Sequence, residues 1–203
     1  MALLAVGGAH AATLFTPALT YSGGGQSLGN GPFSLGYEFT TNAPVKVVAL
    51  GIYQANSGGL SDNHDVGLYD SEGDLLASTT IDAPNGSVSL AGFDYNTVPE
   101  ITLAADATYY VGAEYDDGND PVLFPDNGGV FSTISSISYV QSTYGNPTGF
   151  PNNGYGTNGF FGPNIGVAVP EPATWAMMLL GVGMIGAGLR VARRKNDMAI
   201  IPA

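Results

Sequence analysis

Apolar and polar residues alternate in short runs along the central part of the chain. The runs are rich in β-branched and aromatic residues, which favour strands. In the run 108–115, alternate residues would share one face of a half-buried strand, namely Tyr109, Val111, Ala113 and Tyr115. The pattern predicts strands at 34–40, 45–53, 65–69, 75–81, 101–103, 108–115, 137–144 and 160–167.

Clusters of turn-forming residues separate these runs. They include Asn56–Gly59, Asp70–Asp74, Pro84–Gly86 and Asp116–Asp120. No helical stripe of more than two turns occurs before Thr174. Short strands at turn-marked intervals predict an all-β fold, an antiparallel β-sandwich over residues 12–168.

A stretch near the end of this domain has a different composition. Residues 144–166 are rich in glycine, asparagine, proline and aromatic side chains, which disfavours a separate core. We expect a long loop at 144–159 that returns to the last strand. Its aromatic residues either anchor the loop on the sandwich or form an adhesive surface.

An uncharged segment, residues 173–189, lies close to the C-terminus. As a helix it would span about 25 Å, the short limit for crossing a bilayer. Arg190, Arg193, Arg194 and Lys195 follow directly. By the positive-inside rule, this basic cluster places the tail 196–203 in the cytoplasm and the domain on the periplasmic side. We therefore expect a single short C-terminal transmembrane helix.

Pro170, Glu171 and Pro172 stand directly before this segment. Two prolines around a glutamate hold the chain extended and accessible at the membrane surface. The order of Pro-Glu-Pro, short apolar span and basic cluster over residues 169–195 resembles the PEP-CTERM sorting signal. That family occurs in Gram-negative bacteria that make extracellular polysaccharide. The resemblance implies that a membrane-embedded exosortase recognises Pro170, Glu171 and Pro172, cleaves nearby and releases the protein for surface attachment or export.

The first eleven residues are small and apolar and end in Ala9-His10-Ala11. Ala9 and Ala11 fit the small-residue pattern of signal peptidase, so residues 1–11 are interpreted as a partial signal peptide cleaved after Ala11. A complete signal peptide begins with a basic residue, whereas the first basic residue here is Lys46. An apolar N-terminal segment or a first strand is the alternative.

The strand runs of the domain also resemble a family. The stretches are Phe39–Tyr53, Asp65–Asp70 with Leu75–Thr80, and Leu103–Val111. Together they are similar to secreted bacterial β-sandwich domains of uncharacterised function, over about residues 33–167. The resemblance implies a jelly-roll-like accessory module of an extracellular protein, and no functional residues follow from it.

The charge balance excludes several functions. The formal net charge is −12, and Lys46 is the only lysine or arginine before Arg190. Nucleic-acid binding needs a basic footprint, which this chain lacks. Without cysteine, and with His64 as the single histidine of the domain, no cysteine nucleophile or two-histidine zinc site can form. A serine triad around His64 is formally possible, but no serine lies in a nucleophile elbow. We therefore expect no enzyme and no organic cofactor.

Calcium is the candidate ion, because hard oxygen ligands are what the domain offers in number. The most suggestive loop is 116–120, where Asp116, Asp117 and Asp120 repel one another unless they are solvated or chelated. A plain solvated loop is the alternative. The acidic loops 62–65 and 70–74 are further calcium candidates, and the second also fits a hairpin turn.

These observations predict an exported, non-enzymatic surface or extracellular-matrix protein of a polysaccharide-producing Gram-negative bacterium. Its partners would be an exosortase, transiently the membrane, and extracellular polysaccharide as a candidate ligand. All 11 tyrosines lie within the domain, where they supply either a sugar-binding surface or packing. The alternative is a secreted, polysaccharide-active glycosidase with paired carboxylates, which would converge in a cleft.

Overall fold

The computed structural model describes residues 14–22, 26–29, 31–54, 58–116, 119–124, 129–147, 149–156, 159 and 161–169. Within this part of the chain no helix is long and apolar enough to cross a membrane. The expected helix at 173–189 lies outside the described residues. So do Ala9, Ala11, Asp117, Pro170, Glu171 and Pro172, and the expectations attached to them remain predictions.

The described residues form antiparallel strands. In chain order they are β1 (Phe15–Pro17), β2 (Leu19–Ser22), β3 (Gln26–Gly29), β4 (Phe33–Thr41), β5 (Val45–Tyr53), β6 (His64–Asp70), β7 (Leu75–Ile81), β8 (Val88–Leu90), β9 (Phe93–Leu103), β10 (Thr108–Tyr115), β11 (Pro121–Phe124), β12 (Val130–Thr133), β13 (Ile137–Gly145), β14 (Asn153–Gly156) and β15 (Pro163–Ala168).

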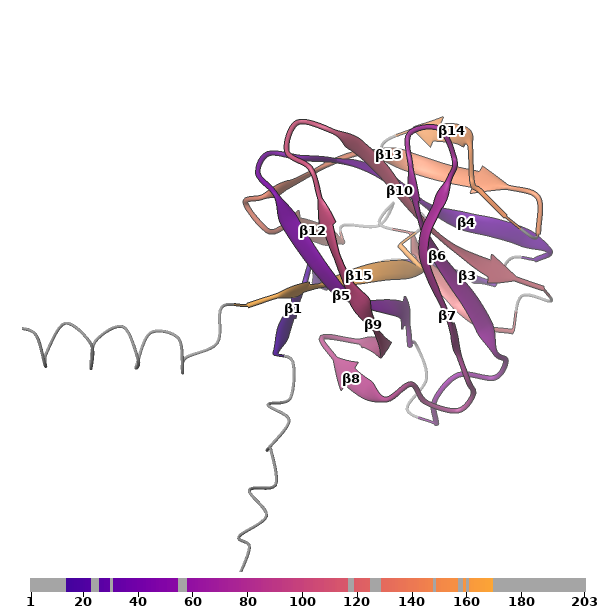
Figure 1. The fold of residues 1–203 in the computed structure, drawn as a ribbon. Helices are drawn as coiled ribbons and strands as arrows, with labels where there is room; N and C mark the ends of the chain where they lie inside the picture. Colours follow the sequence, from indigo (N-terminus) through magenta and orange to yellow (C-terminus); the bar gives the residue numbers. More distant parts are fainter. Residues whose placement is uncertain are drawn as a thin grey trace, which may run out of the picture. The chain divides into compact units, whose positions relative to one another are not determined.

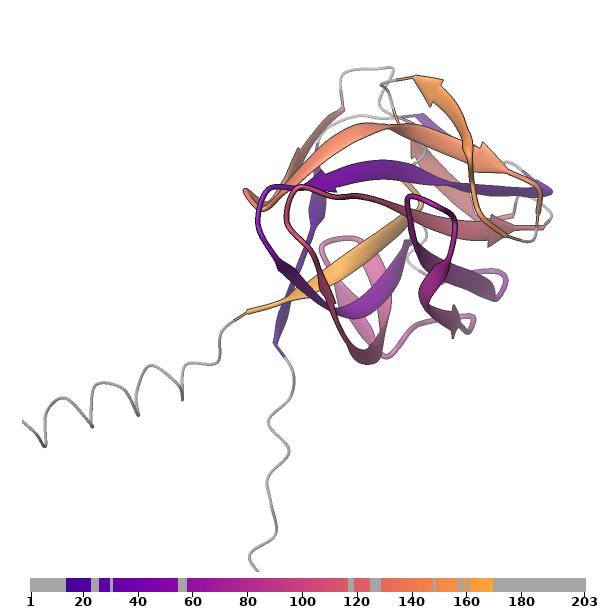
Figure 2. The ribbon, with the colours of Figure 1, turned by 45° about the horizontal axis from the view of Figure 1, so that its top comes forward.

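Two large sheets make up the body of the domain (Figure 1). The five-stranded sheet has the order β1-β15-β5-β9-β8, and the six-stranded sheet has the order β14-β13-β4-β10-β6-β7. Two small sheets pair β11 with β3 and β12 with β2. Figure 2 separates the layer that contains β4 and β13 from the layer that contains β15. The all-β antiparallel prediction is confirmed, while the jelly-roll-like connectivity remains a prediction.

One hydrophobic core lies between the two sheets. In β4, Leu35, Tyr37 and Phe39 are buried and alternate with residues on the outer face, as a strand with one buried face requires. Leu50 and Ile52 of β5 are fully buried in the same core. The amide of Asn164 links the layers: it donates to the carbonyl of Leu19 at 2.7 Å, and its oxygen lies 3.4 Å from the Tyr37 hydroxyl.

The strand predictions agree with most of the long strands, but they miss most of β9 and several short strands. The loop 70–74 is a hairpin turn between β6 and β7, because one oxygen of Asp70 accepts from the N–H groups of Glu72 and Asp74. The stretch 144–159 is a loop only in part, since β13 continues to Gly145 and β14 occupies Asn153–Gly156. The strand expected at 101–103 is the end of the longer β9.

The hairpin between β8 and β9 turns on two residues with positive φ, Ala91 at 53° and Gly92 at 82°. Positive φ at both central positions is the geometry of a type I′ turn, which favours asparagine or glycine. An alanine in this region is strained by about 1 kcal/mol.

Replacing Ala91 with asparagine should therefore raise the free energy of unfolding by about 0.5–1 kcal/mol. Equilibrium urea unfolding of the purified protein measures the change. The matched substitution Ala104→Asn, at an exposed residue without positive φ, should change stability by less than about 0.5 kcal/mol. A less stable Ala91→Asn variant would contradict the assigned turn.

Candidate functional site

A groove of about 480 Å³ lies on the outer face of the six-stranded sheet, over β6, β7 and β10. Its lining consists of Asp65, Val66, Gly67, Tyr69, Leu75, Ser78, Thr79, Thr80 and Glu114. The strand register explains the arrangement, because cross-strand partners share a face. Gly67 pairs with Gly112 on one side and with Ser78 on the other.

Gly67 provides the space for an aromatic wall of the groove. A Cβ added at this position would lie 2.6 Å from the hydroxyl oxygen of Tyr69 and 2.7 Å from its ring carbons. The Tyr69 side chain therefore lies across the glycine, and any larger residue at 67 would displace it. Burial, followed by the negative charges of Glu114 and Asp65, raises the pKa of Tyr69, so its hydroxyl keeps its proton.

Two carboxylates stand next to this wall. The register pairs Val66 with Ala113, so the residues that continue it, Asp65 and Glu114, are neighbours on adjacent strands. Asp65 accepts a hydrogen bond of 2.5 Å from the Thr80 hydroxyl. Partial burial, together with the charges of Asp65 and Asp116, raises the pKa of Glu114, although a backbone hydrogen bond with Gly149 opposes the rise. The groove is thus a region of negative potential.

The glycine-rich segment after β13 folds back over the same outer face. The Phe150 ring packs against Tyr69 and Tyr110, with centroid distances of 5.4 Å and 4.9 Å. The Ser34 hydroxyl donates to the carbonyl of Gly149 at 2.8 Å. For Phe150 the anchoring role expected of the loop aromatics is confirmed, and its ring contacts Tyr69, which lines the groove.

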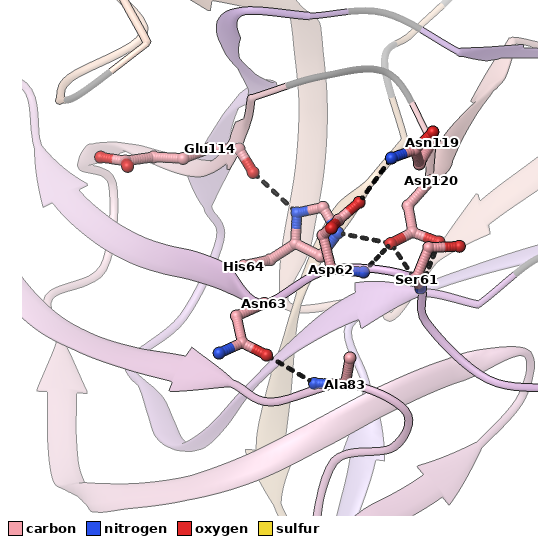
Figure 3. A network of polar contacts seen from close by, with 8 residues as sticks. All are labelled: Ser61, Asp62, Asn63, His64, Ala83, Glu114, Asn119 and Asp120. Carbon is pink, nitrogen blue, oxygen red and sulfur yellow. Dashed lines mark hydrogen bonds and ion pairs between the residues drawn. The ribbon is translucent and has the colours of Figure 1, made fainter.

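A buried polar network underlies this region (Figure 3). His64 begins β6, directly before Asp65, and its side chain is only 4% exposed. Its Nδ1 lies 2.7 Å from the backbone carbonyl oxygen of Glu114, and its Nε2 lies 3.0 Å from Oδ2 of Asp120. Both partners are acceptors, so His64 makes both hydrogen bonds only in its protonated form. Figure 3 shows the Glu114 carboxylate pointing away from the ring.

Asp120 is the other half of this contact. Its carboxylate accepts hydrogen bonds from the backbone N–H groups of Ser61, at 2.8 and 2.9 Å, and of Asp62, at 2.9 Å. Burial by itself would raise the pKa of Asp120, but these hydrogen bonds and the contact with His64 outweigh it and lower the pKa. The amide of Asn119 donates to the Asp62 carboxylate at 3.1 Å and joins the same two loops.

Asp116 and Asp120, which the sequence predicted as ligands of one calcium site, lie in different environments. Asp116 is exposed, whereas Asp120 is buried with its carboxylate engaged by Ser61, Asp62 and His64. Among the described residues, no three histidine, aspartate or glutamate side chains are grouped to hold a metal ion. Because Asp117 lies outside the described residues, calcium binding by this loop remains a prediction.

The sequence allowed His64 to act as the base of a serine triad. Its partners in the structure, the Glu114 carbonyl and the Asp120 carboxylate, were not predicted. Neither ring nitrogen is directed at a serine, since both contact other acceptors. The pairing of Asp65 with Glu114 was not predicted either. The alternation in 108–115 puts Glu114 on the face opposite Tyr109 and Val111, but the pattern carries no information on which strand lies beside it.

The fold and the groove define an all-β domain of two packed antiparallel sheets with a polar groove on one sheet. A family model for a domain of unknown function, DUF4082, matches residues 22–162, and the chain belongs to this family. The model of the PEP-CTERM protein-sorting motif matches residues 168–195. This motif implies an exported protein with a membrane-anchored C-terminal sorting signal, of the kind that exosortases recognise. No curated protein matches the chain.

Replacing Asp120 with asparagine should lower the free energy of unfolding by about 3 kcal/mol at pH 7, because it leaves His64 buried without its charged partner. The pKa of Asp120 is lower in the folded protein, so its carboxylate stabilises the fold above about pH 4, the ordinary range for aspartate. This stabilisation is lost as the pH falls through the folded pKa. The difference between parent and variant should therefore shrink in acid.

Urea unfolding of both proteins across this pH range measures the difference. The control is Asp82→Asn, because Asp82 is exposed, and its effect should stay within about 0.5 kcal/mol. Equal stability of parent and Asp120→Asn at pH 7 would show that the network does not hold the fold.

Proposed function

We propose that this protein is a non-enzymatic surface or extracellular-matrix protein of a polysaccharide-producing Gram-negative bacterium, and that its domain binds extracellular polysaccharide. The observation that carries the proposal is the junction at Ala168. The last strand, β15, ends there, and the match to the sorting motif begins at the same residue. The folded domain is thus the cargo that the sorting signal delivers.

Processing would follow from the order of the signal. Residues 173–189 hold the precursor in the membrane, and the basic cluster after them keeps the tail in the cytoplasm. The domain would then fold on the periplasmic side, and cleavage near Pro170, Glu171 and Pro172 would release it. The membrane contact is transient, and the final location is the cell surface or the medium.

The positions of the tyrosines support a binding role for Tyr69. Tyr37, Tyr95 and Tyr115 are fully buried and serve packing. Tyr69, in contrast, is half-buried and lines the groove together with hydroxyl and carboxylate groups. Ligand sites in proteins combine an apolar wall with a few placed polar groups in this manner.

Replacing Pro170, Glu171 and Pro172 together with alanine should leave the domain folded and abolish processing, since no described core residue lies beyond Val167. The measurement is the ratio of precursor to processed protein in the native host, by immunoblot. As a control, Asn152 and Asn153, both exposed, are replaced with alanine, and processing should be normal. Equal processing of the triple variant and the parent would refute the sorting assignment.

A glycosidase is the second candidate, because Asp65 and Glu114 form a carboxylate pair in the groove and the pKa of Glu114 is raised. Glycoside hydrolysis, however, uses two carboxyl groups that flank the scissile bond. Asp65 and Glu114 stand side by side on one sheet face, so both approach a ligand from the same side. This geometry supports binding more than hydrolysis.

We therefore expect no release of reducing ends when the purified protein is incubated with extracellular polysaccharide from the native host. A reducing-sugar assay, run against the Glu114→Gln variant as blank, measures it. Release by the parent that the Glu114→Gln variant lacks would establish the glycosidase and overturn the non-enzymatic proposal.

A further inference from the structure

We infer that the groove over β6, β7 and β10 binds an uncharged polysaccharide chain, with Tyr69 and Leu75 against the sugar ring and Asp65, Ser78 and Thr80 as hydrogen-bonding partners. The inference rests on the proposed polysaccharide-binding function and adds the site and the chemical class of the ligand. Its basis is the juxtaposition of an apolar wall and a row of polar groups along one groove.

The chemistry of the lining matches that of a sugar. A pyranose ring has apolar C–H faces and a rim of hydroxyl groups that both donate and accept hydrogen bonds. Leu75 is 55% exposed at one end of the groove and offers apolar surface. Asp65 accepts hydrogen bonds, the Ser78 hydroxyl can donate and accept, and the Thr80 hydroxyl, which donates to Asp65, can accept. The groove therefore offers both donors and acceptors to the hydroxyl groups of a sugar.

The charge around the groove selects against acidic ligands. Burial, followed by the negative charges of Asp65 and Asp116, raises the pKa of Glu114, and a further negative charge would be repelled by the same carboxylates. Within the described ranges, the lysine and histidine side chains lie elsewhere. Lys46 pairs with Glu100, and His64 is buried against Asp120. A uronic-acid polymer would thus meet repulsion without a compensating cation.

The lining groups are held in place before any ligand arrives. They stand on three paired strands, with Asp65 opposite Thr80 and Gly67 opposite Ser78. The His64 network fixes the backbone of Glu114 from below, and Phe150 supports Tyr69 from the side. Sites built on paired strands lose little freedom on binding, which favours recognition by several modest contacts.

The test uses the full-length protein in detergent micelles and isothermal titration calorimetry with four hexasaccharides. The uncharged probes are the hexamers of β-1,4-glucose and of N-acetylglucosamine. The anionic probe is hexagalacturonate, and the cationic probe is the hexamer of glucosamine. We expect at least one uncharged probe to bind and the anionic probe not to bind. Failure of both uncharged probes, or binding of the anionic probe, would overturn the inference.

Two variants locate the site. Ser78→Trp places a bulky side chain over the groove, because Ser78 is exposed and stands opposite Gly67, and it should weaken binding at least about tenfold. Thr80→Val removes one hydroxyl with little change in shape and should weaken binding several-fold. The control, Thr102→Trp, changes an exposed residue of the other sheet and should bind like the parent.

Unchanged affinity in both groove variants would overturn the assignment of the site. Thermal melts establish that each variant is folded, and Thr80→Val keeps the test decisive if Ser78→Trp is unstable. Processing of the same variants in the native host separates this inference from the proposed sorting. A chain that is processed normally but binds no uncharged probe would refute the groove assignment and leave the sorting intact.

Discussion

Two loops that are far apart in the chain, 58–63 and 119–120, meet at the buried contact between His64 and Asp120. A buried carboxylate is tolerated only when hydrogen bonds replace the water it has lost, and Asp120 receives them from Ser61, Asp62 and the His64 ring. The second nitrogen of the ring contacts the Glu114 carbonyl, so the same contact fixes the end of β10 beside the start of β6. The position of both groove carboxylates depends on it.

The outer face of the six-stranded sheet shows how few side chains are needed to shape a site. Gly36, Gly112 and Gly67 stand opposite one another on β4, β10 and β6 and remove bulk from one row. Pro151 covers Gly112, and the Tyr69 ring covers Gly67, so the row becomes a floor for larger groups. Beside it, the row of Glu114, Asp65 and Thr80 supplies the polar chemistry. The groove proposed to bind polysaccharide thus arises from strand register and small residues.

The sequence predicted most of the long strands, though only the end of β9, because their alternation is local, as in Thr108–Tyr115. It also predicted the Asp70–Asp74 turn, whose hydrogen bonds join residues at most four apart. Strands of three or four residues, such as β1, β8 and β12, are too short to show a period. The contact of His64 with Asp120 spans 56 positions, and the pairing of β6 with β10 is equally non-local. Such contacts are set by sheet register, which a single sequence does not reveal.

In this chain the last strand of an acidic domain ends at Ala168, and the match to the PEP-CTERM sorting motif begins at the same residue. Removal of the sorting signal is tested most directly by the intact mass of the protein recovered from the surface or medium of its native host. We expect a molecule that ends close to Pro172 and lacks the apolar segment 173–189 with its basic cluster. An exported molecule that still carries residues 173–195 would contradict this expectation.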